Sequence, residues 1–304
     1  MSYSNFMVLL LFFSLSSCSS SQTNSPIIKG PSKTVSFDGY WYNSKAEISS
    51  YRLEQARYGE IHEGIATLIF VTEPFNSSKQ VKSNNAMSPN VVSALKLNQT
   101  RKFTTGIYPY STLTSTFTPV DISAPTSSLK VTNSVQEWCG QVFTQLNKKN
   151  AKYDIQSFSY FESEGDSKKT ISSALLEDEI LNLIRINPKG LPSGEIECIP
   201  SLVYVNFAHQ DLRAYSASAE IGDTTIDGIA LTEYKVRYKQ LNRVLKIYFG
   251  KQFPFKIYGW EEEYSSYNGK SLNTKAIIEN TELIDYWNKN SLADSIYYQK
   301  LFDF

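Results

Sequence analysis

The chain has 304 residues, and its 30 Lys and Arg residues balance its 30 Asp and Glu residues, so the formal net charge at pH 7 is zero. This balance argues against a nucleic-acid-binding protein that works through a strong basic field. Hydrophobic residues make up 41% of the chain and aromatic residues 13%, which is typical of a globular protein. With 2 His and 3 Cys, the chain has little material for metal or nucleophilic chemistry.

The N-terminus has the features of an export signal. Residues 6–15 form an apolar run that is too short to span a bilayer, which takes about 20 apolar residues. Leu15-Ser16-Ser17-Cys18 follows and resembles a bacterial lipobox, in which a peptidase cuts before a cysteine that receives lipid. We expect residues 1–17 to be a signal peptide and Cys18 to be lipidated, although residues 1–5 contain no Lys or Arg. The alternative is an ordinary secretory signal with a chance cysteine.

Residues 18–34 are predicted to be a spacer that precedes the folded domain. Residues 18–34 are rich in Ser, Thr, Asn and Pro and lack apolar periodicity, so we expect a flexible, lipid-anchored tether. Residues 35–304 are predicted to form a single β-rich domain with no membrane-spanning segment. The absence of acidic residues directly after Cys18 favours an anchor in the outer membrane that faces the periplasm. The membrane is thus an expected partner through the N-terminal lipid.

Alternation of apolar and polar residues with period two dominates the rest of the chain and predicts strands. The expected strands lie at 64–74, 94–105, 107–120, 131–146, 153–164, 201–208, 213–221, 229–239, 243–250, 254–264 and 272–279. The segments 131–146 and 153–164 are expected to form a hairpin around residues 147–150. The segment 76–93 is rich in Asn, Ser and Lys and is predicted to be a long loop.

Helices are expected at a few places only. Residues 172–186 carry apolar side chains at helical spacing, with acidic residues in the first half and Pro188 just after the end. Further helices are predicted at 281–289 and 292–302. Runs of strands on both sides of one central helix do not fit a βαβ protein. The sequence therefore predicts a mainly β (α+β) fold, with a large curved antiparallel sheet or open barrel and two or three packed helices.

The motifs of common enzymes are missing. His62 begins a His-Glu pair, but the second histidine of a zinc helix is absent, and His209 lies beside no Ser or Cys signature. There is no G-x-S-x-G, P-loop or G-x-G-x-x-G motif. Cys139 and Cys198 are either a disulfide or, as we favour, two buried thiols. We expect no catalytic residue, metal or cofactor from these patterns.

Two groups of carboxylates are the remaining candidates for chemistry. Glu162 and Glu164 would share a face if the strand at 153–164 continued through them, and Glu261 begins a run of three glutamates. Such carboxylates can hold Ca²⁺ or act as acid and base. The alternative, which we favour, is that they are solvated residues beside turns. Aromatic motifs such as Tyr108-Pro109-Tyr110 are suited either to sugar stacking or to packing within sheets.

Several longer motifs together resemble a family of envelope lipoproteins from Bacteroidota. They are Tyr51-Arg52-Leu53-Glu54-Gln55-Ala56-Arg57-Tyr58-Gly59-Glu60, Phe70-Val71-Thr72-Glu73-Pro74-Phe75, Thr105-Gly106-Ile107-Tyr108-Pro109-Tyr110-Ser111, Ser134-Val135-Gln136-Glu137-Trp138-Cys139-Gly140, Tyr160-Phe161-Glu162-Ser163-Glu164-Gly165-Asp166 and Phe253-Pro254-Phe255-Lys256-Ile257-Tyr258-Gly259-Trp260. Members of this family often carry the name "septum formation inhibitor Maf". The resemblance implies an envelope lipoprotein but no activity, since none is established for the family. True Maf enzymes are cytosolic nucleotide pyrophosphatases, and their N-terminal substrate motif is absent here.

These observations lead to an expected function in the cell envelope. The leading hypothesis is a membrane-anchored, non-catalytic module that binds a lipid, a glycan or a partner protein. The rival hypothesis is a hydrolase of envelope glycans that uses Glu162 and Glu164, or Glu261, as its carboxylates. A Maf-like nucleotide pyrophosphatase is a distant third. A carrier needs a cavity with a continuous apolar lining, whereas a glycosidase needs two carboxylates that face each other about 5–10 Å apart.

Overall fold

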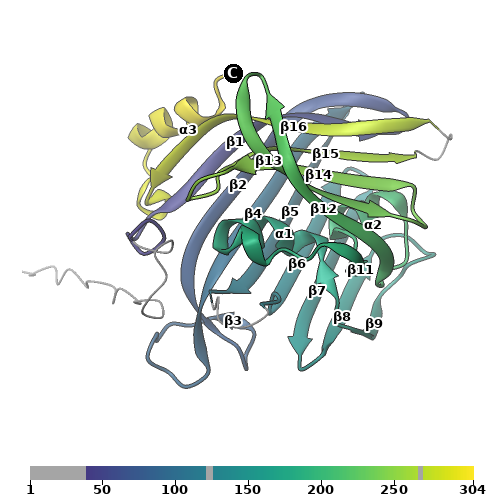
Figure 1. Cartoon of the computed structure of the whole chain (residues 1–304), viewed down its shortest axis with the longest axis horizontal. Coiled ribbons are helices and arrows are strands. Elements are labelled where there is room, and N and C mark those ends of the chain that lie inside the picture. The colour runs from purple at the N-terminus through teal and green to yellow at the C-terminus, as the bar shows by residue number, and fades with distance from the viewer. Residues whose placement is uncertain (1–38, 121–125, 266–269) are drawn as a thin grey trace, which may run out of the picture.

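The computed structural model describes residues 39–120, 126–265 and 270–304, and its strands form one 16-stranded sheet (Figure 1). The strands are β1 (Ala46–Arg57), β2 (Glu60–Asn76), β3 (Val81–Lys82), β4 (Val91–Thr105), β5 (Tyr108–Pro119), β6 (Lys130–Glu137), β7 (Gly140–Lys149), β8 (Lys152–Ser159), β9 (Ser167–Ser172), β10 (Leu175–Leu176), β11 (Gly194–Ile199), β12 (Tyr215–Ile226), β13 (Ile229–Tyr238), β14 (Arg243–Gly250), β15 (Ile257–Ser265) and β16 (Ser271–Ile284). The predicted signal peptide, lipidation site and tether lie outside the described residues.

The sheet is built from two runs of neighbouring strands that meet at its centre, and every neighbouring pair is antiparallel except the short parallel pair β10–β11. The strand order is β10-β11-β12-β13-β14-β15-β16-β1-β2-β4-β5-β6-β7-β8-β9, with β3 attached to β2. β1 and β16, the first and last strands, pair with each other, from Ala46 opposite Ile284 onward. The sheet is not closed, because its terminal strands β9 and β10 pair with β8 and β11 and not with each other.

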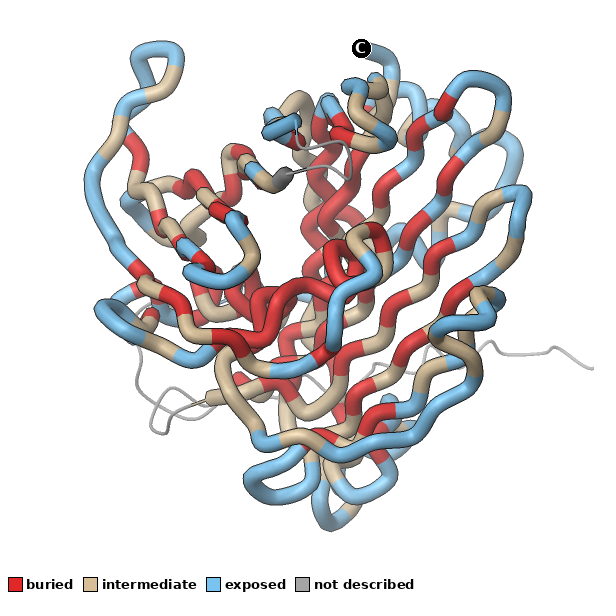
Figure 2. Tube along the Cα trace, turned by 90° about the vertical axis from the view of Figure 1, so that its right-hand side faces the viewer, coloured by how far each residue is buried: buried red, intermediate tan, exposed pale blue. Residues whose placement is uncertain are grey.

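The concave side of the sheet is filled by helical connections between the strands at its β10 end. η1 (Glu177–Glu179), α1 (Ile180–Ile186) and η2 (Pro188–Gly190) connect β10 to β11, and α2 (Leu202–Ala208) connects β11 to β12. Figure 2 shows buried chain inside the curve of the sheet. Asn182 of α1 donates from Nδ2 to the Leu95 carbonyl oxygen at 3.0 Å. Ile180 and Ile184 are fully buried against the main core. A second cluster joins Val131 and Ile155 on one end of the sheet to Leu202 of α2 near the other end.

The outer face carries the C-terminal helix. After η3 (Tyr286–Asn288) and η4 (Leu292–Asp294), α3 (Ser295–Phe302) packs on β1 and β16 (Figure 1). Leu301 is buried there in a small cluster with Ala46, Ile48 and Ile284. Among the described residues, no helix combines the length and apolar character needed to cross a bilayer.

The two ends of the strands are distinct surfaces. The described chain starts at Gly39, close to the beginning of β1, and we call this side the N-terminal end of the sheet. Because neighbours are antiparallel, the tight turns that follow β1, β4 and β6 lie at the opposite side, which we call the distal end. The turn from Tyr160 to Asp166 after β8 lies there too. The distal end is on the right of Figure 1 and faces the viewer in Figure 2.

The predicted fold class is confirmed, and so is the strand prediction over most of the chain. Residues 243–250 match β14. The predicted loop at 76–93 is shorter than expected, because β2 continues to Asn76 and β4 begins at Val91, and it contains the two residues of β3. The predicted strand at 131–146 is wrong in one respect, because Trp138 and Cys139 form a turn that divides it into β6 and β7. The predicted strand at 201–208 is wrong, since these residues begin with a cap at Ser201 and form α2. β1, β9 and β11 were not predicted.

The helix predictions are correct only in part. The helical backbone expected at 172–186 begins at Glu177, because the preceding residues belong to β9, its connection and β10. At 281–289, β16 continues to Ile284 and only η3 is helical, so the predicted helix is wrong there. The prediction at 292–302 is confirmed by η4 and α3.

Candidate functional site

Several turns at the distal end carry large apolar side chains that are exposed to solvent. Ile107 in the β4–β5 turn is 80% exposed, Trp138 in the β6–β7 turn 68%, and Tyr160 after β8 64%. Tyr58 in the β1–β2 turn is 44% exposed. We call these four residues, together with their neighbour Tyr108, the aromatic edge. Exposed apolar side chains gathered in one region mark a binding surface, whereas scattered ones do not.

Rings along half of the aromatic edge approach one another closely. The hydroxyl oxygens of Tyr58 and Tyr110 are 2.6 Å apart. The ring centroid of Tyr110 is 5.8 Å from that of Tyr108, which is 6.3 Å from that of Trp138. These are the separations of interacting aromatic pairs. The rings therefore form a row across the ends of β1, β5 and β6.

The row continues to β8 through a glycine. A Cβ atom on Gly140 would lie 2.5 Å from Cγ of Tyr160, so the tyrosine ring rests on backbone that only glycine leaves open. The ring centroid of Phe161 is 5.8 Å from that of Tyr160 and 5.1 Å from that of His209. His209 follows α2, so the row reaches from the sheet to the segment on its concave side.

One arginine supports the row from below. The Arg57 guanidinium carbon lies 4.4 Å from the Tyr58 ring centroid and 4.6 Å from that of Phe207. Arg57 Nη1 also donates to the Phe207 carbonyl oxygen at 2.6 Å. Because the cation contacts both rings and the end of α2, it fixes the β1–β2 turn against the helix. The rings are thus held in place before any ligand binds.

The predicted carboxylates Glu162 and Glu164 lie at this end but are not on a strand. β8 ends at Ser159, and the N–H groups of Glu164 and Gly165 both donate to the Phe161 carbonyl oxygen in a turn. The expectation that the two glutamates share a strand face is therefore wrong. Glu164 lies 2.6 Å from His209 Nδ1 and accepts from Ser159 Oγ at 2.7 Å. Glu162 is exposed and has no hydrogen bond or ion pair within the described part of the chain.

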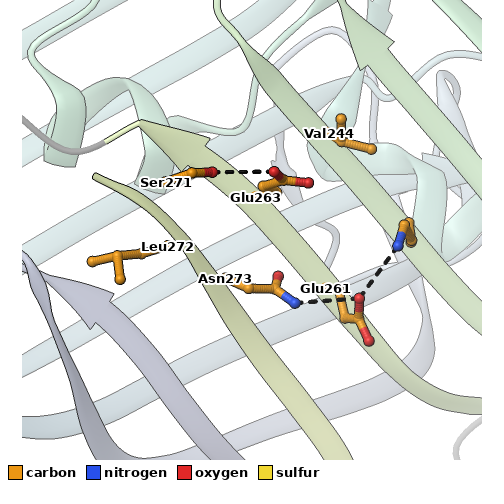
Figure 3. A pocket seen from close by; sticks show the side chains of 7 residues that line it. Val244, Glu261, Glu263, Ser271, Leu272 and Asn273 are labelled. Carbon is orange, nitrogen blue, oxygen red and sulfur yellow. Dashed lines mark hydrogen bonds and ion pairs between the residues drawn. The ribbon is translucent and has the colours of Figure 1, made fainter. Parts of the chain in front are cut away.

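The third predicted carboxylate, Glu261, lies on the outer face of β15, in a cavity of about 250 Å³ (Figure 3). It pairs with Lys246 at 3.5 Å and accepts from Asn273 Nδ2 at 3.3 Å. Glu263, on the same face, accepts from Ser271 Oγ at 3.1 Å. Both carboxylates project side by side from one strand, so they do not flank a bound glycosidic bond from opposite sides.

The central glutamate of that run, Glu262, points inward and belongs to a buried network of charges. Arg101 on β4 pairs with Glu262, which lies 3.3 Å from Arg243 on β14. Arg243 pairs in turn with Glu177 of η1, which accepts from the Tyr238 hydroxyl at 2.8 Å. Although burial opposes ionisation, the two arginines hold the pKa of Glu262 below its usual range.

Beside this network lies a small cavity of about 30 Å³ with an unusual acid, Asp178. Burial raises the pKa of Asp178 to about 7, although its Oδ2 accepts from the Leu202 N–H at 3.0 Å. The carboxylate of Glu177 raises this pKa further. Arg101 Nε and Trp260 Nε1 nearby are buried with no hydrogen-bond partner among the described residues. The space is large enough for about one water molecule and not for an organic ligand.

A second buried ion pair fixes the other side of the core. Arg185 of α1 donates from Nη1 and Nη2 to Glu47 of β1 at 2.6 and 2.5 Å, and Tyr40 donates to the same carboxylate. Burial raises the pKa of Glu47, but the guanidinium more than offsets this effect and holds the pKa below its usual range. Sequence analysis missed both networks. The sequence signal that could have predicted these networks was a charged residue at an inward-facing position of an otherwise apolar strand.

The remaining candidates for chemistry, the two cysteines and His62, do not form a common site. Cys139 is exposed and Cys198 buried, and both are free thiols, so the expectation of two buried thiols holds for Cys198 only. His62 is on β2, and its ring lies 3.2 Å from the Arg57 carbonyl oxygen. Among the described residues, no three His, Cys, Asp or Glu side chains are arranged to hold a metal ion.

Comparisons with protein-family models, with curated proteins and with solved structures found no match to this chain.

Proposed function

We propose that this protein is a non-catalytic module of the bacterial cell envelope, anchored by lipid at Cys18, that binds neutral glycans through the aromatic edge. The observation that carries the proposal is the row of contacting rings of Tyr58, Tyr110, Tyr108 and Trp138, beyond which Tyr160 packs on Gly140. Tyr110 is buried and supports the row, whereas Tyr58, Trp138 and Tyr160 are exposed to solvent. Pre-positioned rings bind without a large loss of conformational freedom.

The chemistry around the rings favours a sugar. A sugar ring has an apolar C–H face that can lie on an aromatic plane and hydroxyl groups that need hydrogen-bond partners at its rim. Glu137 and Glu162 offer carboxylate acceptors beside Trp138 and Tyr160. These carboxylates disfavour an anionic glycan, which supports a neutral ligand.

The alternatives have weaker support. The concave side is packed with side chains of the core, and the 250 Å³ cavity is lined largely by charged and polar residues, which does not favour a carrier of apolar molecules. Glu164 is paired with His209, and Glu261 with Lys246. For the Maf-like activity, Gly222-Asp223-Thr224-Thr225-Ile226 bears only a faint likeness to the Maf metal-site segment, and the Asp223 side chain is 78% exposed and pairs with Lys251 at 2.9 Å.

The test measures binding of residues 19–304 to a panel of neutral glycans and peptidoglycan fragments, with tryptophan fluorescence as the readout. Ligand should change the emission of Trp138, so Trp138→Phe should abolish the signal. Tyr160→Ala should weaken binding by about tenfold or more. Trp287→Phe, at the other end of the molecule, is the matched control and should bind normally.

The same panel separates the rival functions. Glycan turnover abolished by Glu162→Gln or Glu261→Gln would replace this proposal with the hydrolase. Nucleotide turnover abolished by Asp223→Asn would favour the Maf-like activity. Lipidation is tested separately, because Cys18→Ala should abolish fatty-acid labelling and release the protein from the membrane fraction.

A further inference from the structure

The C-terminal segment, residues 285–304, exposes several large apolar side chains to solvent. Leu292 is 95% exposed, Tyr298 65%, Ile296 54% and Trp287 45%. Leu292 and Ile296 are four residues apart along continuous helical backbone, so their side chains are neighbours. Exposure of such an apolar patch to water is unfavourable unless another molecule covers it.

These side chains project from a fixed platform. Leu301 anchors α3 in the small outer core, where the Ser50 hydroxyl donates to its carbonyl oxygen. Asn280 Nδ2 lies 3.4 Å from the same oxygen. The ring of Tyr298 packs on that of Phe302 with centroids 4.7 Å apart. Because Leu301 holds the helix on the sheet, the exposed residues are not a loose end of the core.

The segment lies at the N-terminal end of the sheet, where the chain leads back toward Cys18. It follows Ile284, which pairs with Ala46 at the start of β1, and Figure 1 shows α3 and the start of β1 on the same side. Met87, in the loop between β3 and β4, is 85% exposed at this end. A flexible tether of the proposed length, from Cys18 to Gly39, would have an r.m.s. span of roughly 25 Å. The lipid anchor would therefore keep this end of the molecule close to the bilayer.

The charges of the segment point to an apolar contact and not to an electrostatic one. Lys289 and Lys300 are outnumbered by Asp285, Asp294 and Asp303, so there is no basic patch to attract anionic lipid. Lys289 also pairs with Asp285 at 3.7 Å. Trp, Tyr and Leu side chains are favoured at the boundary between lipid headgroups and acyl chains.

We propose that residues 285–304 lie on the phospholipid surface to which the N-terminal lipid is anchored. The inference rests on the proposed anchor at Cys18, because the tether holds this end of the molecule near the bilayer and adds to an affinity for lipid that the segment has on its own. Contact at this end directs the aromatic edge, at the distal end, away from the membrane. The second contact thus sets the orientation in which the glycan site is presented.

The experiment uses unlipidated residues 19–304, which contain the whole described fold, and vesicles of phosphatidylcholine. We expect a blue shift of tryptophan emission on addition of vesicles, and quenching when the acyl chains are brominated. Both signals should disappear in Trp287→Phe and persist in Trp138→Phe, because Trp41 and Trp260 are buried. A signal that disappears instead in Trp138→Phe would overturn the proposal.

Sedimentation with vesicles supplies a second readout. Leu292→Asp combined with Tyr298→Asp should weaken vesicle binding by about tenfold or more, whereas Ile107→Asp at the distal end should not change it. Binding should persist at 0.5 M NaCl. No binding by the parent chain, equal loss in Ile107→Asp, or a protein dimer dissociated by the double variant would each overturn the proposal. Since the chain carries no lipid, these outcomes do not depend on whether Cys18 is modified.

Discussion

Arg101, Glu262, Arg243 and Glu177 form an alternating chain of buried charges that ties β4, β15, β14 and η1 together. Each charge is costly to bury, and the chain is tolerable only because opposite charges alternate. Such a network adds little net stability compared with an apolar core, but the removal of one member leaves a partner buried without a counter-charge. The residues therefore specify how the helical segment sits in the curve of the sheet.

Removal of the central arginine tests this interpretation. Arg243→Leu should lower the free energy of unfolding by about 3–5 kcal/mol, because Glu177 and Glu262 lose their shared partner. Arg52→Leu is the matched control, since Arg52 is 64% exposed where it pairs with Glu279 and a surface pair contributes about 1 kcal/mol or less. Urea unfolding gives both values. Equal effects of the two substitutions would contradict the role assigned to Arg243.

Asp178 makes the stability depend on pH in a particular direction. Its pKa rises from 3.8 to about 7 on folding, so the folded state binds the proton more tightly than the unfolded state. The stabilisation is present below pH 4 and is lost as the pH rises toward 7. Asp178→Asn should therefore be more stable than the parent at pH 8, by a few kcal/mol at most, and nearly equal to it at pH 4.

Urea unfolding at the two pH values measures this difference. Asp166→Asn, in the exposed turn after β8, is the control and should change stability equally at both. Glu47 and Glu262 have lowered pKa values, so their contribution to stability increases with pH, opposite to that of Asp178. Because both residues are present in parent and variant, their contribution cancels in the comparison. A stability difference between Asp178→Asn and the parent that does not change with pH would exclude this role of Asp178.

The elements that sequence analysis predicted best are those with a strict two-residue alternation of burial. Buried residues of β5 alternate with more exposed ones from Tyr108 to Pro119, and its bounds lie within one residue of the predicted strand at 107–120. The segment at 201–208 failed because its residues are nearly all apolar, so no period was visible. The cap at Ser201 was the local signal that distinguishes a helix from a strand.

That cap can be tested directly. Ser201 Oγ accepts from the Tyr204 N–H at 3.2 Å, and Ser201→Ala leaves this donor without a partner at the start of α2. The free energy of unfolding should fall by about 1 kcal/mol. Ser163→Ala, in an exposed turn, should leave it unchanged. An equal, negligible effect of both substitutions in urea unfolding would mean that burial alone holds α2 as a helix.

Part of the candidate site was also visible in the sequence. Tyr108 and Glu164 were singled out, and Trp138 stood in one of the motifs that carry the family resemblance. Their proximity depends on the sheet order, which brings turns far apart in sequence to one end. Glu164 was assigned to a strand because Phe158, Tyr160 and Glu162 continue the alternation beyond Ser159. The turn after β8 is held by hydrogen bonds from the Glu164 and Gly165 N–H groups to the Phe161 carbonyl oxygen. The residue pattern did not predict these bonds.

At the scale of the whole molecule, the main feature is a sheet that curls without closing. β9 and β10 are separated by only Ser173 and Ala174, and their neighbours share one apolar cluster, yet no ladder joins them. β9 is short, almost fully exposed and carries Lys168 and Lys169. Lysines on an edge strand discourage pairing with another chain, so the seam stays open without promoting aggregation.

The open seam predicts a gradient of stability across the sheet. β1 and β2 have partners on both sides, whereas β9 is bonded on one side only, to β8. Backbone amides of β9 should therefore exchange with solvent by local opening, and those of β1 and β2 only by global unfolding. Hydrogen exchange followed by mass spectrometry should show peptides from 167–172 labelled first and peptides from 46–57 last. If β9 were protected as strongly as β1, a second molecule would have to cover that edge. Repeating the measurement at several protein concentrations would separate that case, because protection supplied by a second copy falls on dilution.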